Sequence, residues 1–289
     1  PGLQGEYSVN EGLQQLLQNS GLTYRVSNGN TVTLEAAENG VMALPAVKIS
    51  ADAEPQNGRA VEGYNVSDIS GIGPWKGRSL QDTPYSISVA SDERLENNFV
   101  TDMDQLAKIN PVVQLARSSS FDDTQYPAIR GFGIWSQIVD GMRLSAPPQG
   151  ISFEEVERIE VLSGLSGFLY GSGNVGGTVN YVLKRPTQEK LTKLTLGNYG
   201  GSQYFAHLDL GGPINENGAF GYRINLMHQN GETAVDGQDK EETLVSGAFD
   251  WHVNKDLLVQ LEASHREYEM QKPSASFDFR GSSVFPDPY

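Results

Sequence analysis

The sequence predicts three structural parts: a small α+β unit, a mixed α/β central domain and the start of a large antiparallel transmembrane β-barrel. Three observations predict this order. A helical apolar stripe precedes a strand hairpin, short strands and glycine-rich turns follow, and from about residue 190 apolar and polar residues alternate over stretches of about ten residues. We place the parts at residues 1–35, 74–186 and 187–289, with a linker at 36–73.

The bulk composition excludes several classes of protein. Lys and Arg number 21 against 36 Asp and Glu, so the formal net charge is −15. An acidic chain is a poor partner for nucleic acid, because phosphate binding needs basic patches. The absence of cysteine excludes disulfides and thiolate metal sites. The sequence has no apolar run near the roughly 20 residues of a spanning helix, whereas barrel strands need only alternation.

The first unit carries helix and hairpin signals. Ser8 can cap a helix, and Glu11 completes a capping box with it. A leucine-rich helical stripe follows Glu11 and ends at Gly21. The stretches at 22–27 and 31–35 flank Asn-Gly-Asn and predict a hairpin. This unit is too small to bury a core alone, so we expect its first half to lie outside the sequence.

The linker and the central domain differ in composition. Residues 36–73 are poor in aromatic residues and rich in Ala, Gly, Pro and Asn, with one β-prone island, LPAVKISA, at 44–51. The central domain has a predicted helix near 102–107. It also has two strands dense in β-branched residues, VERIEVLSG at 156–164 and GTVNYVLKRP at 177–186.

The last part contains about five amphipathic strands. Compact turns, GGPINENG and VNKD, alternate with a longer charged loop, QNGETAVDGQDKEE, and a longer segment after Tyr268. Short turns at one end and long loops at the other are typical of outer-membrane barrels, although the first loop, NYGG, is short. Five strands cannot close a barrel, and an open edge is not viable in lipid. We therefore expect most of the barrel to lie beyond Tyr289.

Four blocks in the central domain carry a family resemblance. They are QDTPYSISV (81–89), AIRGFG (128–133), IVDGMRL (138–144) and VERIEVLSGLSGFLYGSGNVGGTVNYVLKRP (156–186). In this order they resemble the plug of TonB-dependent siderophore receptors. The resemblance implies a plug inside an outer-membrane barrel of about 22 strands. The other partners it implies are a ferric siderophore, outer-membrane lipid and the TonB energy-coupling complex. It implies transport without catalysis or a cofactor. Haem, cobalamin or another chelate stays open as the cargo.

The resemblance also implies a TonB box, the segment that TonB pulls. We assign it to Leu44, Pro45, Ala46, Val47, Lys48, Ile49, Ser50 and Ala51. An extended β-prone segment in a linker can add as a strand to a partner's sheet edge. The stretch LQGEYSVNEGLQQLLQNSGLTYRVSNGNTVTL resembles the end of the secretin and TonB short N-terminal signalling domain. That likeness implies an anti-sigma regulator as a periplasmic partner.

The resemblance assigns further residues to packing of the plug against the barrel. They are Arg130, Gly131, Gly171, Gly176 and Gly177. Arg130 matches a family arginine that pairs with barrel glutamates. The second such arginine is replaced by Ser163, and Leu165 stands where proline is usual. The plug–barrel lock is therefore expected to be weaker or different in this chain.

We expect ligand contacts from plug loops around 117–126, 134–137 and 145–153. The candidates are Arg117, Tyr126, Trp135, Gln137 and Phe153. An arginine and aromatic rings suit an anionic, partly aromatic iron chelate. No metal site is expected, because the four histidines lack ligand spacing.

A nucleotide-binding enzyme is the alternative from another class. Gly171, Gly173 and Gly176 fit G-x-G-x-x-G, a fingerprint that must open a helix. The following TVNYVL is strand-like, which favours tight turns in a plug over a dinucleotide site.

Overall fold

The computed structural model contains three sheets. It describes residues 9–18, 20, 22–27, 31–36, 58–68, 72–73, 78–124, 126–144, 151–166, 169, 174–215 and 218–274. The sheet orders are β1-β2-β11-β12-β13-β14-β15, β3-β9-β10-β7-β8 and β4-β5-β6. None of the described helices is long and apolar enough to cross a membrane.

The N-terminal unit forms as the sequence predicts. Helix α1 (Val9–Leu17) precedes β1 (Leu22–Ser27) and β2 (Thr31–Ala36), which pair antiparallel. The expected cap Ser8 lies outside the described residues.

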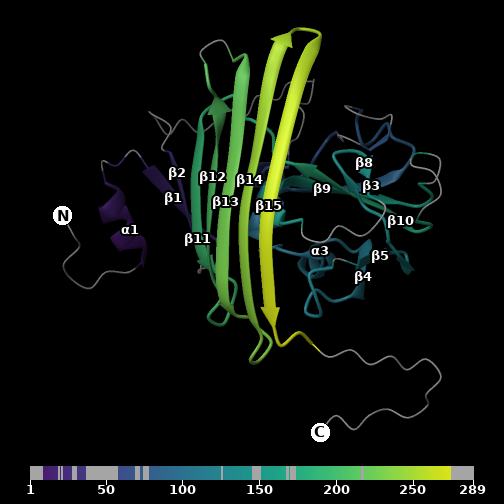
Figure 1. Ribbon diagram of the computed structural model, residues 1–289, viewed down its shortest axis with the longest axis horizontal. Helices are drawn as coiled ribbons and strands as arrows, with labels where there is room; N and C mark the ends of the chain where they lie inside the picture. The colour runs from purple at the N-terminus through teal and green to yellow at the C-terminus, as the bar shows by residue number, and fades with distance from the viewer. Residues whose placement is uncertain are drawn as a thin grey trace.

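The central domain comprises two small sheets and short helices, beside the long strands in Figure 1. Its elements are β3 (Ser86–Ser91), α2 (Asp92–Asn97), α3 (Met103–Ile109), β4 (Val113–Arg117), β5 (Tyr126–Ile129), β6 (Phe132–Gly133), β7 (Ile138–Val139), β8 (Met142–Arg143), η3 (Phe153–Glu155), β9 (Val156–Ser163) and β10 (Gly177–Leu183). The predicted helix near 102–107 is α3, capped by Asp102, whose side chain accepts a hydrogen bond from the Gln105 backbone N–H.

The core of the central domain lies where α2 and α3 cover the five-stranded sheet. Leu106, Ile159 and Tyr181 are fully buried there, together with Met103 and Val161. The β-branched residues that predict β9 and β10 supply the sheet face of this core, because alternate side chains of a strand point the same way. The burial holds the loops between these elements in fixed positions.

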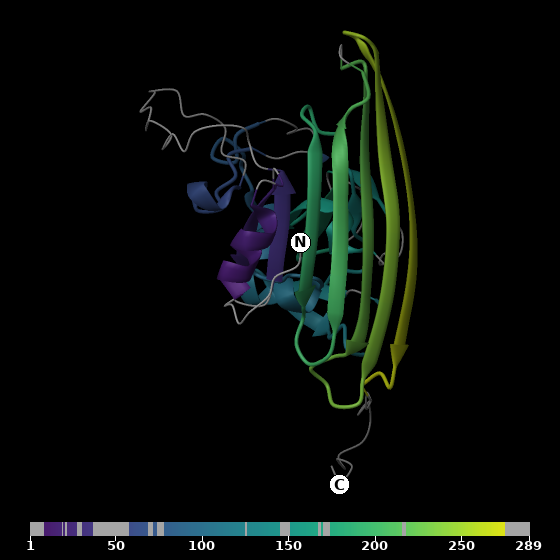
Figure 2. The same cartoon turned by 90° about the vertical axis from the view of Figure 1, so that its left-hand side faces the viewer.

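The five predicted amphipathic strands are present and form one antiparallel wall. They are β11 (Leu191–Asn198), β12 (Tyr204–Pro213), β13 (Phe220–Glu232), β14 (Asp239–Asn254) and β15 (Leu257–Gln271). Figure 2 shows the wall as a curved layer that bows away from the central domain. We call the end with residues 233–238 the loop end and the end with residues 255–256 the turn end.

The face of the wall toward the central domain is polar, and the opposite face is apolar. On β12, His207 and Asp209 are 5% and 2% exposed, whereas Tyr204 is 66% exposed. On β13, Asn225 is buried and Leu226 is exposed. A soluble domain has the reverse pattern, so an exposed apolar face of this kind fits contact with lipid.

The structure corrects the expectation of a long charged loop between the third and fourth wall strands. The strands continue into it, with Gln229 opposite Glu242 and Glu232 opposite Asp239, so the connection is only residues 233–238. The polar composition was misleading, because a backbone ladder does not require apolar side chains.

The wall continues through β2, which pairs with β11 at Leu34 opposite Leu194. At the other edge, β15 pairs with β14, and the described residues supply no strand beyond it.

The part of the linker that is described lies against the central domain. Ser91 donates a hydrogen bond to the Gly58 carbonyl at 2.6 Å, and Asp68 bridges to Ser79. The TonB-box assignment, residues 44–51, lies outside the described residues.

Candidate functional site: a cavity between the central loops and the wall

The larger cavity lies between loops of the central domain and the loop end of the wall. It has a volume of about 600 Å³. Ser118–Ser120 line it from one side, and residues 233–235 with Tyr268 and Met270 line it from the other. Ligand pockets commonly measure roughly 300–1,000 Å³. Its size therefore suits a bound chelate.

The central-domain side of this cavity is a loop shaped by carboxylates. Asp104 accepts a hydrogen bond from the Ser119 backbone N–H at 3.0 Å, and Asp102 accepts one from the Ser119 hydroxyl at 3.0 Å. The Ser120 carbonyl accepts hydrogen bonds from Gln238 and from the Ser274 backbone N–H. Residues Ser118–Ser120, which we call the serine loop, are thus bound to both α3 and the loop end of the wall.

An ion-pair cluster joins the same loop to the wall. Arg266 on β15 donates to both carboxylate oxygens of Asp123 at 2.5 and 2.7 Å. It also donates to Glu242 on β14 at 2.6 Å. The guanidinium lies over the Tyr268 ring, 4.8 Å from its centroid. A bidentate arginine–carboxylate pair fixes orientation as well as distance.

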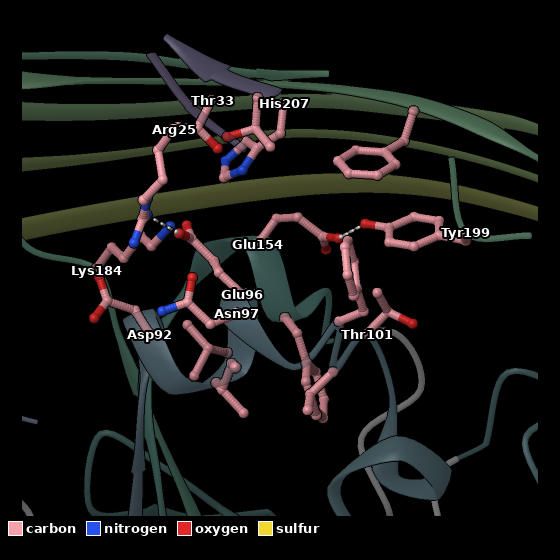
Figure 3. A pocket seen from close by; sticks show the side chains of 17 residues that line it. Arg25, Thr33, Asp92, Glu96, Asn97, Thr101, Glu154, Lys184, Tyr199 and His207 are labelled. Carbon is pink, nitrogen blue, oxygen red and sulfur yellow. Dashed lines mark hydrogen bonds and ion pairs between the residues drawn. The ribbon is translucent and has the colours of Figure 1, made fainter. Parts of the chain in front are cut away.

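The smaller cavity, about 60 Å³, lies nearer the N-terminal hairpin. In Figure 3, Asp92 and Glu96 of α2 face Arg25, Thr33 and His207 across it. This volume accommodates a few waters but no chelate. Because β1 and β2 form part of its lining, this cavity depends on their place at the edge of β11.

Charged side chains that line this small cavity are held by contacts with their neighbours. Glu154 accepts a hydrogen bond from the Tyr199 hydroxyl at 3.2 Å, drawn as a dashed line in Figure 3. Burial raises the pKa of Glu154, with the Glu242 charge acting in the same direction. Arg25 pairs with Glu93 at 3.1 Å.

A second attachment of the central domain to the wall lies nearer the turn end. Lys184, just after β10, reaches Asp209 on β12 at 3.1 Å, and Arg223 on β13 holds the same carboxylate at 2.5 and 2.7 Å. The side chains are 3%, 2% and 7% exposed. The next residue, Arg185, pairs with Asp250 and with Glu262. The end of the central domain is therefore tied to four wall strands.

Three of the five expected ligand residues lie together. Arg117 lies over the Tyr126 ring at 5.8 Å, and Tyr126 meets Trp135 edge-to-face at 5.4 Å. Trp135 is 63% exposed. Gln137 and Phe153 are separate from them and buried, with Phe153 packed on Tyr181. None of the five is among the described residues that line the larger cavity.

The residues assigned to plug–barrel packing lie within the central domain. Arg130 and Gly131 form an exposed turn with positive φ, and among the described residues no ion pair involves Arg130. An added Cβ on Gly176 would lie 2.2 Å from the Ile129 carbonyl, and one on Gly177 would lie 2.1 Å from the Leu162 carbonyl. Both glycines permit close packing of strands inside this domain. Gly171 lies outside the described residues.

The glycine fingerprint opens a strand and not a helix. Gly177 is the first residue of β10. A dinucleotide fingerprint needs a helix N-terminus for the pyrophosphate, so the described geometry opposes the nucleotide-enzyme alternative. Among the described residues no cluster of His, Asp and Glu could hold a metal ion.

Sequence reasoning expected ligand contacts from the loop around 117–126, which contains the serine loop, but it did not select Ser118–Ser120 or the paired charges that line the larger cavity. They come from segments more than a hundred residues apart, such as Asp123 and Arg266. The local signal was the polar run SSSFDD directly after β4. A polar run after a strand is also typical of an ordinary surface loop.

Comparisons with known proteins agree with this architecture. Residues 79–178 match the TonB-dependent Receptor Plug Domain, and residues 1–37 match the Secretin and TonB N terminus short domain. The chain belongs to the TonB-dependent receptors. The fold and the relatives are those of transport receptors, not enzymes. Members of this family lie in the outer membrane, and the exposed apolar face of the wall fits such a setting.

The relatives are siderophore receptors by name. The ferric-pyoverdine BN7/BN8 receptor of Pseudomonas putida is 26% identical over 280 residues, 95% of this chain and 34% of that protein. The ferric-pyoverdine M114 receptor PbuA of a Pseudomonas strain is 29% identical over 269 residues, 90% of this chain and 32% of that protein. The chain thus spans about a third of these curated relatives.

Solved structures show the same fold. The ferric preacinetobactin receptor BauA of Acinetobacter baumannii has a TM-score of 0.62 at 30% identity, covering 68% of this chain and 30% of that one. The ferripyoverdine receptor of Pseudomonas aeruginosa has a TM-score of 0.65 at 22% identity, covering 92% of this chain and 33% of that one.

Proposed function

We propose that this chain is the plug-bearing part of a receptor that binds a ferric siderophore and carries it across the outer membrane with energy delivered through TonB. The observation that carries the proposal is the cavity of about 600 Å³ at the loop end, bounded by plug loops and the polar face of the wall. The siderophore receptors among the relatives support the cargo. The loop end then faces outward and the turn end faces the periplasm, as short turns do in such barrels.

In this proposal the wall continues into a closed barrel. A barrel closes by pairing its first strand with its last, so the closing strand takes the edge of β11 that β2 holds here. The N-terminal hairpin would then sit in the periplasm. There it could present ligand occupancy to an anti-sigma regulator, and the match to the short N-terminal domain supports that role.

The two attachments between the plug and the wall have different roles in the proposed transport. The serine loop and Asp123 contact the cargo cavity, so an arriving chelate meets them first. The buried Lys184–Asp209–Arg223 group lies away from that cavity and keeps the end of the plug on the wall. TonB would pull at residues 44–51, and rearrangement of the plug would open a path along the polar face.

Growth on defined nutrient sources tests the cargo. A strain lacking the native gene should lose growth on one or more ferric siderophores as the sole iron source and recover it on complementation. Growth on cobalamin-dependent medium and on haem iron should be unchanged. Normal growth on every ferric siderophore, with failure on cobalamin or haem, would assign a different cargo.

A further inference from the structure

The described lining of the larger cavity is acidic. Its charged side chains are five carboxylates and two cations: Asp102, Asp104, Asp122, Asp123, Glu242, Lys240 and Arg266. The formal charge of the lining is therefore −3. An anion that enters between low-dielectric walls of the same sign is repelled more strongly than it would be in water.

Both cations of this lining already have carboxylate partners. Lys240 Nζ lies 3.1 Å from Glu242 Oε2, and Arg266 is shared between Asp123 and Glu242. Each also lies over the Tyr268 ring, at 5.4 and 4.8 Å from its centroid. An anionic ligand would have to compete with these carboxylates for either cation. No other cation among the described residues lines the cavity.

Arg117, which directly precedes the lining residue Ser118, is also paired. Arg117 Nη2 lies 2.8 Å from Asp122 Oδ2 and stacks over Phe121. The sequence suggested that this arginine would attract an anionic chelate. In the structure its charge is balanced by a neighbour that itself lines the cavity.

The lining offers mainly hydrogen-bond acceptors. A carboxylate presents about four lone-pair sites, and the hydrogen bonds that the described residues donate to Asp102 and Asp104 do not use all of them. The hydroxyl protons of Ser118 and Ser119 already go to these carboxylates, so a ligand in the cavity can use these two hydroxyls only as acceptors. Such a surface is matched by a ligand that supplies N–H and O–H donors without negative charge.

We propose that this site takes ferric chelates whose surface is neutral or cationic and rich in amide or ammonium donors, and that it rejects triply anionic ones. Three singly charged hydroxamates neutralise ferric iron, whereas three doubly charged catecholates leave a triply negative chelate. The site therefore selects the tris-hydroxamate class over the tris-catecholate class. This inference rests on the proposed siderophore function.

Equilibrium binding to the purified receptor, expressed from the native gene, tests the inference. The probes are a panel of ferric tris-hydroxamates, including ferrichrome and ferrioxamine B, and a panel of ferric tris-catecholates, including ferric enterobactin. We expect the tightest chelate to come from the first panel, with every tris-catecholate at least about tenfold weaker. A tris-catecholate as the tightest ligand would overturn the charge inference and leave the proposed function standing. Absence of binding by both panels and by ferripyoverdine would instead overturn the proposed function.

Two matched variants locate the origin of the discrimination. Asp122→Asn removes one carboxylate of the lining and releases Arg117, whereas Asp256→Asn makes the same charge change at the turn end. We expect the preference for hydroxamates over catecholates to narrow roughly fivefold in Asp122→Asn only. An equal change in both variants, or none in Asp122→Asn, would show that the cavity charges do not set the preference.

Discussion

The buried charge group that ties the plug to the wall makes a quantitative prediction for Asp209→Asn. The carboxylate of Asp209 serves two cations, Lys184 at 3.1 Å and Arg223 at 2.5 and 2.7 Å. Burial alone would lower the pKa of Lys184, but the carboxylates of Asp209, Glu96 and Asp92 hold it above its ordinary value. Lys184 is therefore charged and depends on its partners.

Asparagine at this position leaves two buried cations facing each other without their shared carboxylate. Removing one partner of a buried ion pair costs about 3–5 kcal/mol, because the other charge stays desolvated. Lys184→Met is the matched comparison. It removes one cation and leaves Asp209 with Arg223, so we expect a loss of only about 1 kcal/mol.

These 289 residues contain no cysteine, so a cysteine introduced among them is their single labelling site. Ser163 is 6% exposed on β9, and a Ser163→Cys background reports plug unfolding by maleimide labelling in urea. With a slope of about 2 kcal/mol per molar urea, a loss of about 4 kcal/mol lowers the midpoint by about 2 M. A midpoint for Asp209→Asn equal to that of Asp256→Asn would refute the reasoning. So would a smaller shift than that of Lys184→Met.

Two further predictions concern the plug interior. Gly176→Ala should destabilise the plug by more than about 2 kcal/mol, because the new Cβ would lie 2.2 Å from the Ile129 carbonyl. Gly133→Ala, whose nearest contact is 3.4 Å, should cost less than about 1 kcal/mol, and equal midpoints would contradict the packing argument. Burial raises the pKa of Glu155 from 4.5 to about 7. The neutral form therefore contributes stability below pH 4.5 that is lost as pH rises through 7, about 3 kcal/mol in all. In Glu155→Gln the urea midpoint of labelling should vary less with pH between 4.5 and 7. Above pH 7 this midpoint should be higher than that of the parent protein. An unchanged pH profile would contradict this.

The sequence predicts much of the fold because its strongest signals are local. The alternation on either side of His207 and Asn225 predicts the wall strands and which residues share a face. Helix α2 was missed because it has only six residues and one buried apolar side chain, Leu95, so no helical period is visible. Its cap, Ser91, could have indicated it, since the side chain accepts a hydrogen bond from the Arg94 backbone N–H.

The site is less predictable because it depends on contacts between distant segments. Arg117 and Tyr126 were chosen for chemistry and loop position, and they do lie together, but the cavity is lined by Ser118–Ser120, Asp122 and Asp123 between them in the chain and not by either of the two. Its charge balance depends on Asp123 meeting Arg266, and nothing local to either residue predicts that pair. Selection of a binding residue by type alone ignores the partner that neutralises it, as Asp122 does for Arg117.

Uptake of radiolabelled iron tests the central claim most directly. Cells carrying the native gene would receive a panel of ferric siderophores, with LPAVKISA (44–51) intact or deleted. Deletion of residues 37–43 serves as the control for linker length. The account predicts that loss of 44–51 abolishes uptake while surface binding is retained, and that the control deletion leaves uptake intact. Uptake that continues at the normal rate without residues 44–51 would contradict energy coupling through this segment.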